Sequence, residues 1–200
     1  MLLKNLENTT VMKNIICFET EWLYNHQDKQ NRFNLNTQPI LQWLKEFYNI
    51  EVIYRKILTR NDIGYYMDYF NDRRRFKNYQ IIYIAAHGTS QSIYLEGEED
   101  PLKLSELAQI VPGFFEDRIV HFSSCTTMRN FEAVSEFKKQ THALRVSGYC
   151  KKVDAMDSAI LDMAYLNALQ NFKVKTIEKE ASKFQQHYAS LIDYLQFQIV

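Results

Sequence analysis

The sequence predicts an α/β fold, a three-layer α/β/α sandwich in which helices cover both faces of a mostly parallel sheet. Short apolar runs alternate along the chain with longer stretches of helical spacing, the order that produces parallel strands joined by helices. The chain has 200 residues, of which 46% are hydrophobic, so a substantial core is expected. Only five glycines and three prolines occur, and no repeat or low-complexity linker divides the chain. We therefore expect residues 1–200 to form a single domain.

Five apolar runs predict strands, and those that end at His87 and Cys125 are typical of strands buried on both faces, as in a parallel sheet. The five runs cover residues 13–19, 50–58, 81–87, 118–125 and 142–149. The segment Ser92 to Gly97 predicts a small hairpin arm between the third and fourth of these strands. The Asn- and Gln-rich residues 25–36 predict a loop after the first strand.

Helices are expected where apolar residues recur every three or four positions. These stretches cover about residues 39–48, 61–72, 103–111, 129–139, 156–170 and 176–197. Asn61 and Asp62 are predicted to cap the second of them. Because helices separate most of the strands, the strands are expected to run parallel.

Composition argues against several classes of partner and site. Twenty-four basic residues balance twenty-four acidic ones, so no overall charge attracts nucleic acid or anionic lipid. Three cysteines cannot all pair, and no Cys or His spacing typical of zinc occurs. The sequence shows no signal peptide and no apolar segment long enough to span a bilayer. We expect a reduced, cytoplasmic protein with no metal or other cofactor and with neither nucleic acid nor membrane as a partner.

His87 and Cys125 each stand where a predicted strand ends, and this pairing is the most informative feature of the sequence. In a parallel sheet, ligands and chemistry lie beyond the carboxyl ends of the strands, so the two side chains are expected to face one crevice. A thiol attacks a carbonyl carbon as the thiolate, and an imidazole can accept its proton or protonate the leaving amine. The start of the following helix would favour the thiolate. The backbone amides of Gly88 and Cys125 could donate to the oxyanion.

Taken singly, both residues have ordinary explanations. A cysteine at a strand end is more often a small buried hydrophobic residue than a nucleophile, and a His-Gly pair is more often a turn. The remaining histidines and cysteines are expected to be structural, buried or solvated. They are His26, His121, His142, His187, Cys17 and Cys150.

Around His87 and Cys125 the sequence resembles the clan CD cysteine peptidases, the group of caspases, gingipains, separases and CHAT domains. That group carries a hydrophobic block followed by His-Gly and a second block that closes on the nucleophilic Cys, matched here by IIYIAAHG and RIVHFSSC. CHAT domains and separases are the closest in pattern, and the segments HGTSQSIYLEG, PLKLSELAQIV, THALRVSGY and VDAMDSAILDMAYLNAL continue the likeness over roughly residues 79–170. The resemblance implies a caspase-like fold and peptide-bond cleavage by a dyad of His87 and Cys125.

The resemblance also implies a preference for a basic residue before the scissile bond. In arginine-selective relatives an acid in the segment after the fifth strand lines the S1 pocket and pairs with the guanidinium of the substrate. Asp154 and Asp157 stand in that segment here. Asp154 is also well suited to cap the helix that follows, and Asp157 suits its first turn, so both readings stay open.

The sequence thus predicts a cysteine endopeptidase that acts on a protein or peptide substrate, with an activating partner protein left open. One alternative is a catalytically silent caspase-like module that binds a partner protein. Another is a small-molecule-binding α/β protein in which His87 and Cys125 lie apart.

Overall fold

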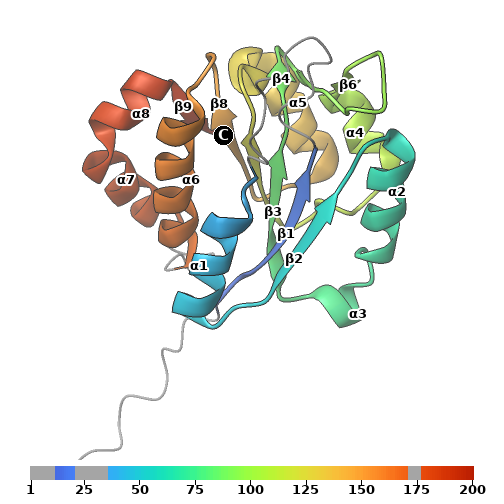
Figure 1. Ribbon diagram of the computed structural model, residues 1–200, viewed down its shortest axis with the longest axis horizontal. Helices are drawn as coiled ribbons and strands as arrows, with labels where there is room; N and C mark the ends of the chain where they lie inside the picture. Colours follow the sequence, from blue (N-terminus) through green and yellow to red (C-terminus); the bar gives the residue numbers. More distant parts are fainter. Residues whose placement is uncertain (1–11, 21–35, 171–176) are drawn as a thin grey trace, which may run out of the picture.

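The computed structural model of the protein describes residues 12–20, 36–170 and 177–200. Its centre is a six-stranded sheet with the order β2-β1-β3-β7-β8-β9, in which β8 and β9 are antiparallel and the other neighbours are parallel (Figure 1). The strands are β1 (Asn14–Glu19), β2 (Val52–Lys56), β3 (Tyr79–Ala85), β7 (Ile119–Ser123), β8 (Arg145–Tyr149) and β9 (Phe197–Ile199). The predicted α/β class with a mostly parallel sheet is confirmed.

Helices cover both faces of this sheet, and the core is divided into one apolar cluster on each side (Figure 1). One face carries α1 (Gln38–Tyr48), α6 (Ala155–Gln170), α7 (Ile177–His187) and α8 (Ala189–Leu195). The other carries α2 (Arg60–Tyr69), α3 (Arg73–Phe76), α4 (Leu104–Ile110) and α5 (Phe131–Thr141). Because side chains alternate along a strand, Ile16 and Phe18 of β1 belong to one cluster and Ile15 and Cys17 to the other. The arrangement is compatible with the predicted three-layer sandwich.

The central strands β3 and β7 place the two candidate catalytic residues at one edge of the sheet. The strands are parallel neighbours, and Ala85 at the end of β3 is aligned with Ser123 at the end of β7. His87 and Cys125 each follow two residues beyond those ends. Both segments therefore leave the sheet at the same edge, as the sequence predicts.

A small antiparallel sheet follows His87 directly. It consists of β4 (Gly88–Thr89), β5 (Ser92–Ile93) and β6 (Leu102–Lys103). A hairpin is present in this region, but the predicted boundaries of Ser92 to Gly97 are wrong, because the first strand begins at Gly88. The amide of Gly97 instead donates to the carbonyl of Leu58, beyond the end of β2.

Two helix ends differ from prediction because a neighbouring residue has the better capping geometry. Thr59, not Asn61, is the N-cap of α2, and its side chain accepts from the amide of Asp62 while the Asp62 carboxylate accepts from the Thr59 amide. His142 does not begin a strand. It ends α5 with a left-handed φ of 53°, and β8 begins at Arg145.

The C-terminal segment contains a strand that the sequence does not reveal. The single helix expected over 176–197 is wrong, since α7 ends at His187 and α8 ends at Leu195. Gln196 then takes a left-handed φ of 50°, and β9 pairs with β8, with Phe197 opposite Tyr149. Of the predicted loop over 25–36, only Asn36 lies within the described residues, and His26 lies outside them. No helix of the described residues is long and apolar enough to cross a bilayer.

Arg118, immediately before β7, is a buried cation, and it forms no ion pair with the residues that the structure describes. Its Nη2 donates to the carbonyl of Phe70 at 3.0 Å, and its guanidinium lies 4.5 Å from the centre of the Phe114 ring. Among the described residues, its Nε and Nη1 have no hydrogen-bond partner. Burial lowers the pKa of Arg118 to about 9, so the folded state disfavours the charged form.

Replacing Arg118 by methionine should therefore keep the fold and raise the free energy of unfolding by about 1–3 kcal/mol, because it removes an uncompensated buried charge at similar volume. Urea denaturation at pH 7 measures the change. Arg74→Met serves as the matched control, since the Arg74 side chain is 95% exposed, and it should leave stability unchanged. A clear loss of stability in Arg118→Met would contradict this account.

Candidate active site

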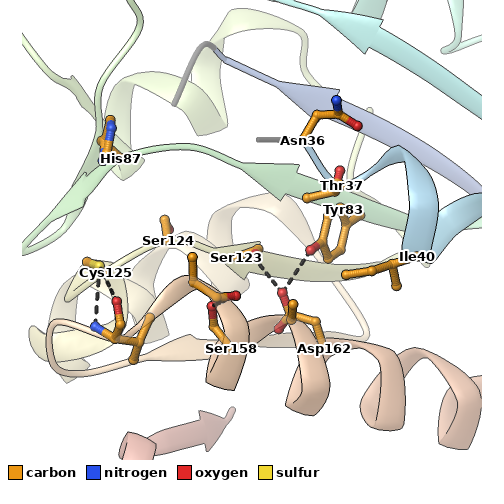
Figure 2. A pocket seen from close by; sticks show the side chains of 13 residues that line it. Asn36, Thr37, Ile40, Tyr83, His87, Ser123, Ser124, Cys125, Ser158 and Asp162 are labelled. Atoms are coloured by element: carbon orange, nitrogen blue, oxygen red, sulfur yellow. Dashed lines mark hydrogen bonds between the residues drawn. The ribbon is translucent and has the colours of Figure 1, made fainter. Parts of the chain in front are cut away.

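His87 and Cys125 line the same cavity, which has a volume of about 210 Å³ and a mostly apolar wall (Figure 2). The wall is built from the carboxyl ends of β3 and β7 and the N-terminal ends of α1 and α6. Figure 2 shows His87 and Cys125 toward one end of the cavity and Ile40 and Tyr83 toward the other. The structure therefore brings together the two residues that the sequence places at strand ends.

The turn after β7 holds Cys125 at the rim of the cavity, partly exposed. Thr126 has a φ of 56°, in the left-handed region that a β-branched residue rarely adopts. Its amide donates to the carbonyl of Lys151 at 3.1 Å. The amide of Val153 donates to the Cys125 sulfur, with 3.5 Å between nitrogen and Sγ, and such a donor can stabilise charge that develops there.

The helix that follows Cys125, predicted from about residue 129, begins at Phe131. A short 3-10 turn, Thr127–Arg129, comes first, and α5 starts at Phe131 with Asn130 as its N-cap. The start of α5 therefore does not adjoin the thiol in sequence, and the expected stabilisation by a helix N-terminus is not provided in that way. The Val153 amide is the donor that the structure places at the sulfur instead.

Gly88 allows the turn that carries His87 to pack against the turn that carries Cys125. A Cβ at Gly88 would lie 2.3 Å from the carbonyl oxygen of Cys125 and 2.3 Å from Oγ1 of Thr127. Those distances are far shorter than real contacts, so this position requires glycine. Thr127 also donates to the carbonyl of Ser92 at 3.2 Å, which ties the cysteine turn to the small hairpin.

A buried carboxylate at the floor of the cavity was missed by the sequence analysis. Asp162 of α6 is 1% exposed and lines the cavity together with Ser123 and Tyr83. Its Oδ2 accepts from the hydroxyls of Tyr83 at 2.7 Å and Ser123 at 2.5 Å. Its Oδ1 accepts from the hydroxyl of Tyr149 at 2.5 Å and lies 2.7 Å from Nε2 of His121. Four side chains thus converge on one acid.

This environment keeps the carboxylate ionised. Burial by itself raises the pKa of Asp162, but attraction to His121 and the hydrogen bonds from its neighbours together lower it below its usual value. Burial and the adjacent Asp162 carboxylate raise the pKa values of Tyr83 and Tyr149 well above the ordinary value. Both tyrosines therefore stay protonated and can donate to the acid.

A family profile matches residues 12–200, which include the complete sheet, the cavity and both turns. The chain belongs to DUF6642, a family of unknown function. A search of curated proteins finds no match for the sequence.

The two acids predicted for substrate selection do not line the cavity of this DUF6642 chain. Asp154 is exposed, and its Oδ1 accepts from the amides of Met156 at 2.8 Å and Asp157 at 3.3 Å. This is the capping geometry that the sequence analysis gave as the other reading. The acid in the cavity is Asp162, which follows on the same helix. The sequence offered one faint signal for it, since Asp162 is the only acid in the apolar run AILDMAYL over residues 159–166.

The other thiols are less suited to nucleophilic chemistry. Burial and the neighbouring Glu19 raise the pKa of Cys17 well above its usual value, and burial raises the pKa of Cys150. A protonated thiol is a poor nucleophile. Within the described part of the chain, no three His, Cys, Asp or Glu side chains are grouped so that they could hold a metal ion.

In this DUF6642 chain, Gly88→Ala should force the His87 and Cys125 turns apart and lower the free energy of unfolding by about 2–3 kcal/mol, as overpacking does elsewhere. Urea denaturation measures the loss. Gly64→Ala in α2 is the matched control, because its new Cβ would meet only the Cγ2 methyl group of Ile110, at 3.2 Å. Equal stability of the two variants would show that the close approach at Gly88 is unimportant.

Proposed function

We propose that the protein is a cysteine endopeptidase of the caspase-like type that cleaves after basic residues. The observation that carries the proposal is that His87 and Cys125, from adjacent parallel strands, line one cavity whose floor is a buried carboxylate. The resemblance of both segments to clan CD peptidases supports the same reading. No metal or organic cofactor is needed for this chemistry.

The reaction divides into acylation and hydrolysis. The Cys125 thiolate attacks the scissile carbonyl carbon, and the carbonyl oxygen takes up the negative charge. The carbon–nitrogen bond then breaks while His87 donates a proton to the leaving amine, which leaves a thioester on Cys125. A water molecule attacks the thioester and gives a proton to His87, and the carbon–sulfur bond then breaks, which releases the acid and regenerates the Cys125 thiolate.

The amides of Gly88 and Cys125 are the proposed oxyanion donors. Gly88 is paired with Ile93, while the amide of Tyr94 donates to the carbonyl of His87 at 2.8 Å. In an antiparallel pair the hydrogen-bonded positions alternate, so Gly88 occupies a position whose amide points away from the partner strand. That amide is left available as a donor beside the cysteine turn.

The cavity presents hydrogen-bond acceptors to an incoming side chain. Ser123 and Tyr83 each donate their hydroxyl proton to Asp162, and Thr37 donates to Oε2 of Glu19 at 2.8 Å. Each hydroxyl has a single proton, so lone pairs remain for a ligand. Two buried carboxylates lie behind these acceptors, and no lysine or arginine is among the described residues that line the cavity.

A lysine or arginine side chain fits this arrangement. Its charged end carries donors only, and it matches acceptors backed by negative charge. Ile40, Val153 and Ala159 supply apolar wall for the methylene groups. This supports the cavity as the S1 pocket, with Asp162 in the role that the sequence analysis gave to Asp154 and Asp157.

A non-catalytic module that binds a partner protein is the second candidate. Large exposed apolar side chains on the adjoining helices α1 and α6 favour it, since such groups often mark interaction surfaces. They are Trp43, Phe47, Met156 and Ile160. Catalysis that depends on Cys125 separates the two candidates.

Fluorogenic peptides with Arg, Lys or Asp before the scissile bond provide that test. The wild-type protein is expected to cleave after Arg or Lys, Cys125→Ala to be inactive, and His87→Ala to lose about 10²–10⁴-fold in kcat/KM. Cys150→Ala, which removes a partly exposed thiol elsewhere, should retain activity. No cleavage by folded, reduced protein, together with no selective alkylation of Cys125, would favour the binding module.

Asp162→Asn tests the selectivity of the pocket. It should lower the ratio of kcat/KM for Arg over the neutral isostere citrulline by about 10–100-fold, because the charge behind the acceptors is lost. Asp154→Asn, at an exposed capping position, should leave that ratio unchanged. A fall in the ratio with Asp154→Asn alone would return the selecting role to Asp154. Thermal unfolding of both variants controls for damage to the fold.

A further inference from the structure

His121 lies directly behind the cavity and has no part in the proposed bond-breaking steps. It is fully buried in β7, with Nε2 at 2.7 Å from Oδ1 of Asp162 and Nδ1 at 3.0 Å from Oγ of Ser147. Among the described residues it is the only basic side chain in contact with Asp162. The pair therefore consists of the Asp162 carboxylate, which is ionised, and the His121 imidazole, which is charged only when it is protonated.

The groups packed around the His121 ring come from β3, β8, β9 and α6. They are Tyr83, Tyr149, Phe197, Tyr165 and Asp162. Burial raises the pKa of Tyr165 to about 12 and raises those of Tyr83 and Tyr149 well above the ordinary value, so all three tyrosines are neutral near pH 7. Further out, Arg145 of β8 acts electrostatically on Tyr165, and Cys17 of β1 acts on Tyr83.

A carboxylate buried to this degree requires a compensating charge. An ion taken out of water without a partner is strongly disfavoured, and the pair becomes tolerable when an opposite charge is in contact. With the cavity empty, His121 is the described basic side chain that could supply that charge, since its Nε2 lies 2.7 Å from Oδ1 of Asp162. A basic side chain at the cavity floor would bring a second cation to the same carboxylate, and of the two cations only the imidazolium can lose its proton near neutral pH.

We propose that His121 is a specificity-determining counter-ion of this pocket, protonated when the pocket is empty and deprotonated when a basic side chain is bound. The inference rests on the proposed function, since it requires the cavity to receive a basic side chain. One cation enters and one proton leaves to solvent, so the charge of the cluster is unchanged and Asp162 stays ionised.

Two consequences distinguish this arrangement from a fixed negative pocket. The affinity for a cationic ligand rises by up to about tenfold per pH unit while His121 is protonated in the empty pocket, and it levels off once His121 is neutral. The affinity for an uncharged isostere does not change over the same range. Selection of Arg over a neutral side chain is therefore weaker in acid and stronger above neutrality.

Isothermal titration calorimetry of the wild-type protein with n-butylguanidinium and its neutral counterpart n-butylurea tests the inference. Titrations near pH 6 in two buffers of different ionisation enthalpy count the protons released. We expect close to one proton released per butylguanidinium bound and none with butylurea. The Kd for butylguanidinium should fall about tenfold between pH 5.5 and 6.5.

His121→Gln keeps a hydrogen-bond donor for Asp162 and removes the titration. It should bind butylguanidinium with no proton release and with a Kd that is the same at pH 5.5 and 7.5. If this variant does not fold, the proton count of the wild-type protein decides alone.

Binding of butylguanidinium to the wild type without proton release from pH 5.5 to 7.5 overturns the inference and leaves the basic S1 pocket standing. No binding at any pH overturns the inference and the basic S1 assignment together, whereas cleavage that depends on Cys125 would still uphold the peptidase.

Discussion

The carboxylate of Asp162 is the point at which the central elements of this molecule are joined. It comes from α6, and its four side-chain partners come from β3, β7 and β8. A carboxylate has about four lone-pair sites, so the acid is fully satisfied by side chains alone. Such a network is rigid because every member depends on the position of the others. The floor of the cavity is fixed by the same contacts that hold the helix against the sheet.

Backbone packing fixes the other side of the site. The turns after β3 and β7 approach so closely at Gly88 that no side chain fits between them, and hydrogen bonds from Thr126 and Thr127 tie the cysteine turn to the hairpin strands β4 and β5. His87 and Cys125 thus take their positions from strand register and turn geometry. The floor and the rim are held by different sets of contacts, so a change at Asp162 need not disturb the positions of His87 and Cys125.

Much of this arrangement could be predicted from the sequence because it depends on local pattern. Apolar runs located the strands, and the rule that parallel strands end at one edge brought His87 and Cys125 to one cavity. The cap of α6 by Asp154 was also given by local chemistry. These features can be predicted from a residue and its near neighbours in the sequence.

The features that were missed depend on partners far away in sequence. Asp162 lies in an apolar helical stretch, and it bonds Tyr83, which is 79 residues earlier. His121 was expected to be structural or solvated, and its place within a predicted strand does not reveal which acid it will meet. The strand β9 looked like the end of a helix, because three residues are too few to set a period of two apart from a helical one. The left-handed Gln196 that ends α8 is equally invisible to a hydrophobic pattern.

Burial of the Asp162 carboxylate costs free energy, and this cost helps to explain why an acid stands at this position. A well-packed apolar group at this position would often be as stable as a buried ionic cluster, or more so, and would leave no charge to compensate. Apolar side chains could therefore join α6 to the sheet in place of Asp162, His121 and three hydroxyl donors. An apolar floor could not, however, place negative charge behind a layer of acceptors at the end of a cavity beside a thiol and an imidazole. The site is where pattern-based expectation and structure diverge most, as is typical of positions that serve function rather than folding.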